Sequence, residues 1–196
     1  MNLLIIAGMP ASGKSTLSNK ISEHLGYPII EKDAIKEQLF DTIGFNSYAE
    51  KRQLDTAANA VLIRMSDELM RRGVSHIIVN NFRTNESVAV KELVDKHKAK
   101  VVTIFLNGDA DVFYQRYVER DRNGARHIGH AVQEHYPPRP TDPKTHEMSR
   151  TEFAEKFESA GMDNFNVGGM RIEIDATYPQ EIDTAALITE IESAFN

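Results

Sequence analysis

Cysteine and tryptophan are missing from this chain of 196 residues, and only 8% of the residues are aromatic. Without cysteine there is no disulfide framework, no thiol nucleophile and no thiolate metal site, which fits a reducing compartment. The chain starts without a basic segment before its first apolar run, and no apolar run is long enough to span a membrane. We therefore expect a cytoplasmic protein that has no membrane partner.

Positive charge is also scarce, because 23 Lys and Arg residues face 29 Asp and Glu residues and the net charge is −6. No global basic field attracts nucleic acid, so a nucleic-acid partner is disfavoured, although a local basic groove stays open. With 41% apolar residues, a chain of this length can bury a complete hydrophobic core. We expect a single domain over residues 1–196.

Short apolar runs alternate along the chain with longer segments that have helical spacing. Nearly unpatterned apolar strands between helices indicate right-handed βαβ crossovers and a parallel sheet with helices on both faces. The fold class is therefore predicted to be α/β. The expected strands are residues 3–7, 27–30, 76–79, 101–106 and 170–174.

One helical segment has recognisable signals at both ends. Ser47, with Glu50 three residues later, predicts a capping box, and Gly73 after two arginines predicts the end of the helix. A second capping box is predicted for Ser149 and Glu152. Apolar residues recur between Ser47 and Gly73 at steps of three and four, and we expect this stripe to face the core. The stripe consists of Leu54, Ala58, Val61, Met65 and Leu69.

Residues 121–143 break the alternation of strands and helices. This segment has no sustained apolar periodicity, and it contains several Arg and His residues as well as four prolines. Loops of this length are uncommon in compact domains and tend to be lids or binding loops. We expect a lid over about residues 116–145, with a surface insertion as the alternative. The prolines are Pro137, Pro138, Pro140 and Pro143.

A glycine-rich motif follows the first predicted strand and precedes a predicted helix. Residues 8–15 contain Gly, four further residues and then Gly-Lys-Ser. In this motif the glycines let backbone N–H groups turn inward and the helix N-terminus adds positive charge, so the loop cradles phosphates. Lys14 is expected to reach the β- and γ-phosphates, Ser15 to ligate Mg²⁺ and Thr16 to bond the α-phosphate. The expected nucleotide-binding residues are Gly8, Pro10, Ala11, Ser12, Gly13, Lys14, Ser15 and Thr16.

Other residues indicate what the nucleotide is used for. The chain lacks an Asn-Lys-x-Asp guanine motif, and Asn80 and Asn81 follow the third strand where a hydrolytic motor would carry acids. Asp33 follows the second strand, at the edge where parallel sheets bind ligands, and is expected to accept or orient an acceptor hydroxyl proton. The alternative is that Asp33 only caps a helix that starts at Ala34. Lys36 either binds an anionic group of the acceptor or is a solvated lysine.

The predicted lid carries four arginines, and guanidinium groups in a closed site stabilise charge on a transferring phosphoryl group. Arg120 and Arg126 are the candidates for this role, with surface ion pairs to Glu119 and Asp121 as the alternative. The spacing of the histidines does not fit a zinc site, so metal binding through them is disfavoured. The arginines are Arg116, Arg120, Arg122 and Arg126, and the histidines are His127, His130 and His135.

These motifs resemble the small P-loop kinases, a group that includes the kinase part of polynucleotide kinase, zeta toxins and chloramphenicol phosphotransferase. The resemblance implies a sheet of five parallel strands in the order 2-3-1-4-5, a lid helix with arginines, and Asp33 as general base. It also suggests residues 175–178 as a loop beside adenine. The chain departs from relatives at Asn80, where many carry an acid, so Mg²⁺ would depend on Ser15, phosphates and water. The resemblance rests on residues 8–16, 32–33, 35–37, 39–41, 81–82 and 126–130.

We therefore expect a phosphotransferase that uses ATP and Mg²⁺ to phosphorylate a hydroxyl group of a small molecule. Asp33, Lys36 and Asn81 are expected to contact the acceptor. One alternative is a polynucleotide 5′-hydroxyl kinase. Polynucleotide kinases resemble one another in carrying arginines at the positions of Lys32 and Lys36, and lysines lack the guanidinium groups that bind phosphate through two hydrogen bonds. The other alternative is a nucleotide-binding regulator or toxin-type module with little turnover. The sequence does not identify the acceptor.

Overall fold

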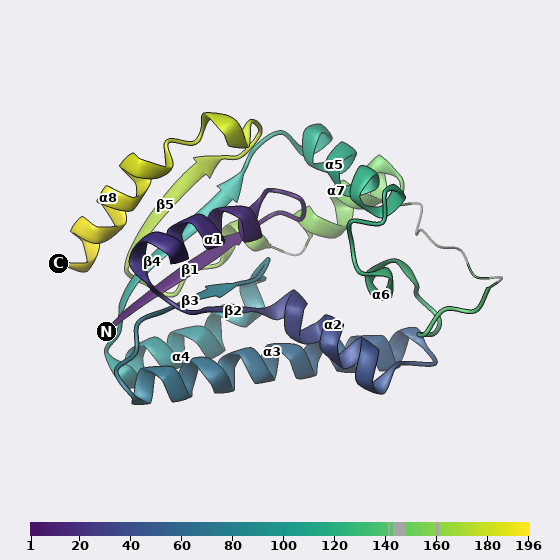
Figure 1. Ribbon diagram of the computed structural model, residues 1–196, viewed down its shortest axis with the longest axis horizontal. Coiled ribbons are helices and arrows are strands. Elements are labelled where there is room, and N and C mark those ends of the chain that lie inside the picture. Colours follow the sequence, from purple (N-terminus) through teal and green to yellow (C-terminus); the bar gives the residue numbers. More distant parts are fainter. Residues whose placement is uncertain (141, 143–147, 160) are drawn as a thin grey trace.

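The computed structural model describes residues 1–140, 142, 148–159 and 161–196, and the statements below concern these residues. Its centre is a five-stranded sheet in the order β2-β3-β1-β4-β5, in which all neighbouring strands are parallel (Figure 1). The predicted fold class, strand number and strand order are confirmed. The strands are β1 (Asn2–Gly8), β2 (Ile29–Glu31), β3 (His76–Val79), β4 (Lys100–Asn107) and β5 (Met170–Asp175).

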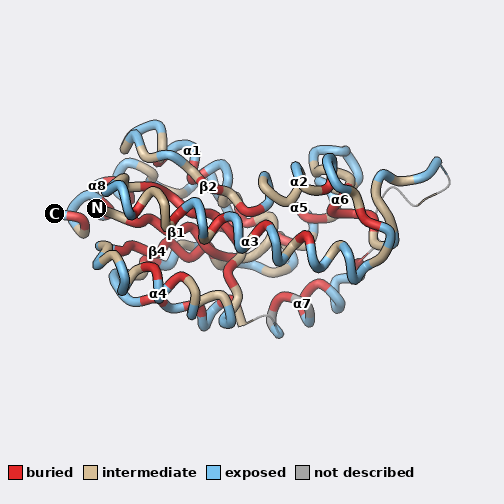
Figure 2. Tube along the Cα trace, turned by 90° about the horizontal axis from the view of Figure 1, so that it is seen from below, coloured by how far each residue is buried: buried red, intermediate tan, exposed pale blue. Residues whose placement is uncertain are grey.

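Helices cover both faces of the sheet. The helices of the described residues are α1 (Lys14–Leu25), α2 (Lys32–Ile43), α3 (Tyr48–Arg71), α4 (Ser87–His97), α5 (Ala110–Arg122), α6 (Ile128–Ala131), α7 (Arg150–Glu158) and α8 (Thr184–Phe195), with 3₁₀ turns η1 (Thr84–Glu86), η2 (Met162–Asn164) and η3 (Pro179–Glu181). Helices α1 and α8 contact each other on one face, and α3 and α4 contact each other on the other (Figure 2). Strand β1 is therefore buried along nearly its whole length. Within the described residues, no helix is long and apolar enough to cross a membrane.

Helix α3 begins and ends where the sequence predicts, but the face that it turns toward the core differs from the predicted one. The Ser47 hydroxyl accepts a hydrogen bond from the Glu50 N–H at 3.2 Å, and Gly73, with a φ of 72°, follows the last turn. Val61 and Met65 of the predicted stripe are 39% and 47% exposed, so the predicted face is wrong at these positions. The buried residues of α3 are Leu54, Ala58, Leu62, Ser66 and Met70.

A buried polar pair explains why the apolar pattern misplaced this face. The Ser66 Oγ atom lies 2.7 Å from Nε2 of His76 in β3, and Nδ1 of His76 donates to the main-chain oxygen of Val74 at 3.1 Å. Both side chains are fully buried, and both are hydrogen-bonded, so the pair fits the core. A search for apolar residues cannot detect a core position that is occupied by serine.

The chain between β4 and β5 extends away from the sheet. Helix α5 continues the chain to Arg122, and α6 then lies near α2 (Figure 1). Phe45 and Tyr136 pair through their main chains. In the predicted lid, residues 141 and 143–145, including Pro143, lie outside the described residues, and closure of this segment over a nucleotide stays a prediction. A small second core, called the satellite core here, consists of Phe40, Phe45, Leu54 and Val132.

Candidate active site

The loop between β1 and α1 has a backbone suited to anion binding. Gly8, Ala11 and Gly13 have φ values of 132°, 62° and 91°. A Cβ atom on Gly8 would lie 2.2 Å from the main-chain oxygen of Leu106, so this close approach to β4 requires glycine. The buried hydroxyl of Ser12 has no hydrogen-bond partner among the described residues. Together with the first N–H groups of α1, which have no partner within the helix, this hydroxyl fits a phosphate group.

Lys14 is folded back over this loop. Its Nζ atom donates to the main-chain oxygens of Met9 at 2.7 Å and Gly8 at 3.1 Å. Burial lowers the pKa of Lys14 to about 8, while the negative charge of Asp33 opposes the shift and the positive charge of Arg120 adds to it. An anion placed in the loop would stabilise the protonated amine.

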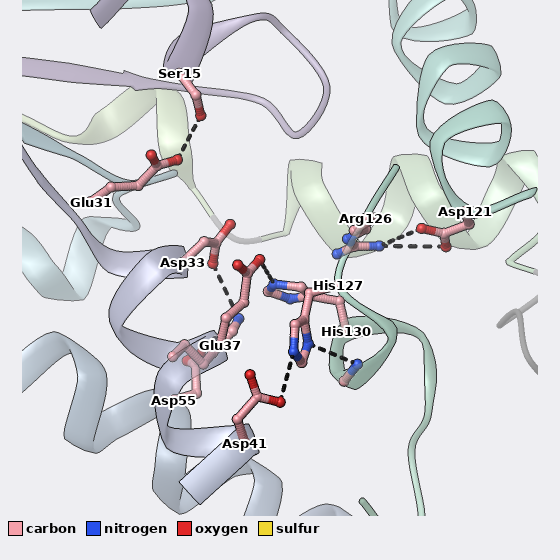
Figure 3. Close-up of polar contacts among 12 residues, drawn as sticks. Ser15, Glu31, Asp33, Glu37, Asp41, Asp55, Asp121, Arg126, His127 and His130 are labelled. Carbon is pink, nitrogen blue, oxygen red and sulfur yellow. Dashed lines mark hydrogen bonds and ion pairs between the residues drawn. The ribbon is translucent and has the colours of Figure 1, made fainter. Parts of the chain in front are cut away.

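Ser15 has a carboxylate partner at the carboxyl end of β2, two strands away from β1 in the sheet. Its hydroxyl donates to Oε1 of Glu31 at 2.6 Å, and Figure 3 shows the two side chains pointing toward each other. Hydroxyl and carboxylate oxygens are ligands that Mg²⁺ prefers. No three Asp, Glu, His or Cys side chains form a metal-binding group in the described part of the chain. Sequence analysis missed Glu31, although it directly follows the strand predicted over residues 27–30 and so lies at the same edge of the sheet as Asp33.

A cleft of about 610 Å³ lies beyond the carboxyl ends of the strands, next to this loop. Two of the expected nucleotide-binding residues, Gly8 and Ser12, are buried and do not line it. Arg122, an arginine of the predicted lid that was not a candidate for phosphoryl binding, is exposed and does not line the cleft. The predicted site residues that line the cleft are Pro10, Ala11, Gly13, Lys14, Ser15, Thr16, Asp33, Lys36, Asn81, Arg120 and Arg126.

Asp33 does not cap the helix that contains it. Helix α2 begins at Lys32 with Glu31 as its N-cap, so the alternative of a helix starting at Ala34 is wrong. The Asp33 side chain is 52% exposed in the cleft, and its Oδ1 atom lies 3.3 Å from Nζ of Lys36 (Figure 3). Its carboxylate is thus free to accept further hydrogen bonds from the cleft.

Two lysines and a second aspartate surround Asp33. Nζ of Lys36 also lies 3.1 Å from Oδ1 of Asp55 in α3, and Nζ of Lys32 lies 3.1 Å from the same oxygen. The side chain of Lys36 is nearly buried, so Lys36 is not the solvated lysine of the alternative interpretation. The cleft walls oppose ionisation of Asp33, but Lys36 and the neighbouring cations hold the pKa of Asp33 well below its usual range. Asp33 is therefore an ionised hydrogen-bond acceptor and a weak base.

The two candidate arginines differ in their partners. Nη1 of Arg126 lies 3.1 Å from Oδ1 of Asp121 (Figure 3). The Arg126 guanidinium also lies over the Tyr117 ring, at 4.7 Å from the ring centre. The ion pair suggested by the sequence is therefore present, yet Arg126 still lines the cleft. Arg120 lines the cleft near Lys14 and forms no ion pair within the described residues.

Arg116 has a structural contact. It donates to the main-chain oxygen of Ala176 at 3.0 Å and to that of Thr177, so α5 holds the loop after β5. On the other side of this loop, a Cβ atom on Gly108 would lie 2.6 Å from Oγ1 of Thr177. Residues 175–178, suggested to lie beside adenine, are thus fixed between α5 and the end of β4.

Two histidines attach the α6 segment to one face of α2 (Figure 3). Nε2 of His130 lies 2.8 Å from Oε1 of Glu37, and Nε2 of His127 lies 3.1 Å from Oδ1 of Asp41. Glu37 and Asp41 follow Asp33 at steps of four residues, so all three carboxylates share one face of the helix. Sequence analysis missed these pairs, whose members are 93 and 86 residues apart in the chain.

The parallel sheet, the phosphate-binding loop and the cleft at the carboxyl ends of the strands give this chain the fold of the small P-loop kinases. A family model described as an AAA domain matches residues 3–136, and the chain belongs to this family. A comparison with curated proteins finds no match.

Solved structures are similar over almost the whole chain. A candidate kinase from Chloroflexus aurantiacus is 26% identical, with a TM-score of 0.83, over 100% of this chain and 98% of that one. A sugar kinase from a Janibacter species is 16% identical, with a TM-score of 0.58, over 100% and 98%. A gluconokinase from Sinorhizobium meliloti is 15% identical, with a TM-score of 0.53, over 99% and 91%. The predicted resemblance to small P-loop kinases is confirmed.

Proposed function

We propose that this protein transfers the γ-phosphoryl group of ATP to a hydroxyl group of a small polar molecule. The observation that carries the proposal is that a phosphate-binding loop and the ionised Asp33 line one cleft of about 610 Å³. Two neighbours are a sugar kinase and a gluconokinase, which supports a small hydroxylated acceptor. Polynucleotide is disfavoured because carboxylates line the cleft and the net charge is −6.

The loop would hold the phosphates of ATP. Its backbone N–H groups and Lys14 would contact the β- and γ-phosphates, and Thr16 would contact the α-phosphate. Ser15 and Glu31 would hold Mg²⁺, directly or through water. Bound Mg²⁺ would neutralise charge between the β- and γ-phosphates. Arg120 is close enough to Lys14 to share the phosphate side of the cleft.

In the transfer step, the acceptor oxygen forms a bond to the γ-phosphorus. The bond from this phosphorus to the oxygen that bridges the β- and γ-phosphates breaks, and ADP leaves with the electron pair. Asp33 accepts a hydrogen bond from the attacking hydroxyl and takes its proton as the new bond forms. Because Asp33 is a weak base, we infer that its main contribution is orientation. Arg120 and Arg126 stabilise the charge on the transferring group.

The test is ADP release with ATP, Mg²⁺ and a panel of acceptors. The panel contains D-glucose, D-gluconate and myo-inositol, their deoxy analogues, and ethanol as a compound with one hydroxyl group. We expect release that depends on the acceptor, and a phosphorylated product that mass spectrometry detects. A protein that binds ATP but releases no ADP in response to any hydroxyl compound would contradict the proposal and favour a nucleotide-binding module.

A further inference from the structure

We propose that His130 binds the acceptor, with its Nδ1 atom accepting a hydrogen bond from a second hydroxyl group next to the one that Asp33 holds. This inference rests on the proposed kinase function and specifies its substrate class. The acceptor is then a polyhydroxylated small molecule, and Glu37 is a positioning residue that acts through His130.

The position of His130 is fixed by contacts with two helices, α2 and α3. Its side chain is only 4% exposed, and it lines the same cleft as Asp33. Its ring packs edge-on against the ring of Phe40 in α2, with 5.8 Å between the ring centres. Lys51 of α3 donates to its main-chain oxygen at 3.0 Å. The ring is therefore presented to the cleft in one orientation.

Glu37 determines which ring nitrogen of His130 carries the proton. A carboxylate oxygen only accepts hydrogen bonds, so Nε2, at 2.8 Å from Glu37, is the donor. In a neutral ring Nδ1 is then an acceptor, and none of the described residues donates to it. Burial lowers the pKa of His130 below its usual value, although Glu37 and Asp33 oppose the shift. The ring is neutral at pH 7, so Nδ1 is open to a ligand.

The charges around His130 come from both sides of the cleft. Asp33, Lys36 and Glu37 face it from α2, and Arg126 faces it from the turn before α6. Asp33 and Nδ1 both accept hydrogen bonds and neither donates one. A ligand that pairs with both must therefore bring two donors, which two hydroxyl groups supply. A compound with a single hydroxyl group would leave one acceptor unpaired.

The central test is His130→Gln with the best polyhydroxylated acceptor of the panel. Gln keeps an N–H donor for Glu37 but has no atom in place of Nδ1. We expect kcat/KM for the acceptor to fall by about three- to tenfold, the usual effect of one neutral hydrogen bond, while the KM for ATP is unchanged. With the wild type, kcat/KM for a deoxy analogue without the second hydroxyl should be lower than that for the full acceptor by this same factor. With His130→Gln, kcat/KM should be the same for the analogue and for the full acceptor.

Asp41→Asn is the matched control for Glu37→Gln, because Asp41 holds His127 of the same segment and does not bond to His130. Protonation of Nδ1 removes the acceptor, so kcat/KM should fall as the pH falls through the pKa of His130. Glu37→Gln removes a negative charge that favours the protonated ring. It should therefore move this acidic limb to lower pH, whereas Asp41→Asn should leave it in place.

Several results would overturn the inference. Equal losses at every pH with Glu37→Gln and Asp41→Asn would mean that both contacts only dock the segment. Unchanged acceptor kinetics in His130→Gln, or ethanol as good an acceptor as any polyhydroxylated compound, would also overturn it. If His130→Gln does not fold, the pH profile of kcat/KM for Glu37→Gln tests the inference, and an acidic limb that does not move to lower pH would overturn it. Absent ATP binding would instead contradict the proposed function itself.

Discussion

Asp33 is a residue whose charge serves both stability and the proposed reaction. The pKa of Asp33 is lower in the folded protein than in the unfolded chain. The ionised carboxylate therefore stabilises the fold at a pH above the usual pKa, and this stabilisation is lost as the pH falls toward the lowered pKa. Asp33→Asn should therefore lower the free energy of unfolding at pH 7, and the difference should begin to shrink only as the pH falls below about 4, toward the lowered pKa of the folded protein. Transfer to the acceptor should fall by on the order of a hundredfold with ATP affinity retained. Urea unfolding at two pH values and steady-state kinetics measure these effects.

Asp55→Asn is the matched control, because Lys36 loses a carboxylate partner while Asp33 keeps its own charge. We expect it to change stability and to retain most of the transfer rate. Wild-type turnover in Asp33→Asn would show that Asp33 neither orients the hydroxyl nor accepts its proton.

The charge of Lys14 has the opposite effect on stability at pH 7 from the charge of Asp33. Its pKa is lowered from 10.5 to about 8 by burial, so the unfolded chain binds more protons between these values and stability rises with pH across them. At pH 7 the buried ammonium group therefore destabilises the fold. Lys14→Met should not lower Tm, while it weakens nucleotide binding or abolishes transfer.

Proton uptake provides an independent measurement for Lys14. Calorimetry of ATP binding at pH 8, in two buffers that differ in ionisation enthalpy, should reveal uptake by the wild type as the phosphates raise the pKa of Lys14. Lys14→Met should show less uptake. Identical buffer dependence in the two proteins would assign the proton to another group.

The site could be predicted from the sequence to the extent that its geometry is local. Residues 8–15 are contiguous, and Asp33 follows a strand, so the edge of the sheet brings the two together. The pair of Lys36 with Asp55 and the pair of Glu37 with His130 could not be predicted, because packing between helices brings their members together.

At the scale of elements, the contact between α3 and β3 depends on the buried pair of Ser66 and His76. Ser66→Ala removes the donor to Nε2 of His76 and should cost about 1–3 kcal/mol of stability, the usual effect of an unpaired buried group. Met65→Ala is the control, because Met65 is exposed and its loss should change stability by about 0.5 kcal/mol or less. Urea unfolding compares them, and equal losses would contradict the orientation of α3.

Burial also makes this contact sensitive to pH. It lowers the pKa of His76, so the unfolded chain takes up a proton first and wild-type stability should decrease as the pH falls below about 6.5. His76→Gln should show a smaller change with pH. A stability curve that is equally steep in both proteins would assign the pH dependence to other groups.

Element positions were the most predictable part of the fold. The capping box of Ser149 and Glu152 is present at the start of α7, as the spacing of these residues predicted. Strands that are buried on both faces have apolar runs that identify them without any partner. The rotation of α3 was not predictable, because apolar residues lie on two of its faces and only packing against the sheet and the neighbouring helices selects one.

At the scale of the whole molecule, the two halves of the proposed site belong to different cores. The phosphate-binding loop joins β1 to α1 within the main core, whereas Asp33, Lys36 and His130 come from the helices that the satellite core joins. Nucleotide binding and acceptor binding therefore depend on different packing, and a substitution in the satellite core should separate them.

Phe45→Ala makes this separation measurable. Phe45 packs edge-on against Phe40 at 5.3 Å and stacks on Tyr136 at 6.1 Å between ring centres, and removal of a buried phenyl ring costs about 3–5 kcal/mol. Hydrogen exchange should accelerate in α2 and residues 128–136 but not in β1. ATP should still raise Tm, because it binds the main core, while phosphorylation of the acceptor is lost.

Leu93→Ala in α4 is the matched control for this experiment, since Leu93 is buried in the main core and is not part of the satellite core. It should lower the protection of the sheet as a whole and leave the ratio of ATP binding to acceptor phosphorylation unchanged. If Phe45→Ala also accelerates exchange in β1 and abolishes the effect of ATP on Tm, the two cores unfold as one cooperative unit and the separation of the two binding functions is wrong.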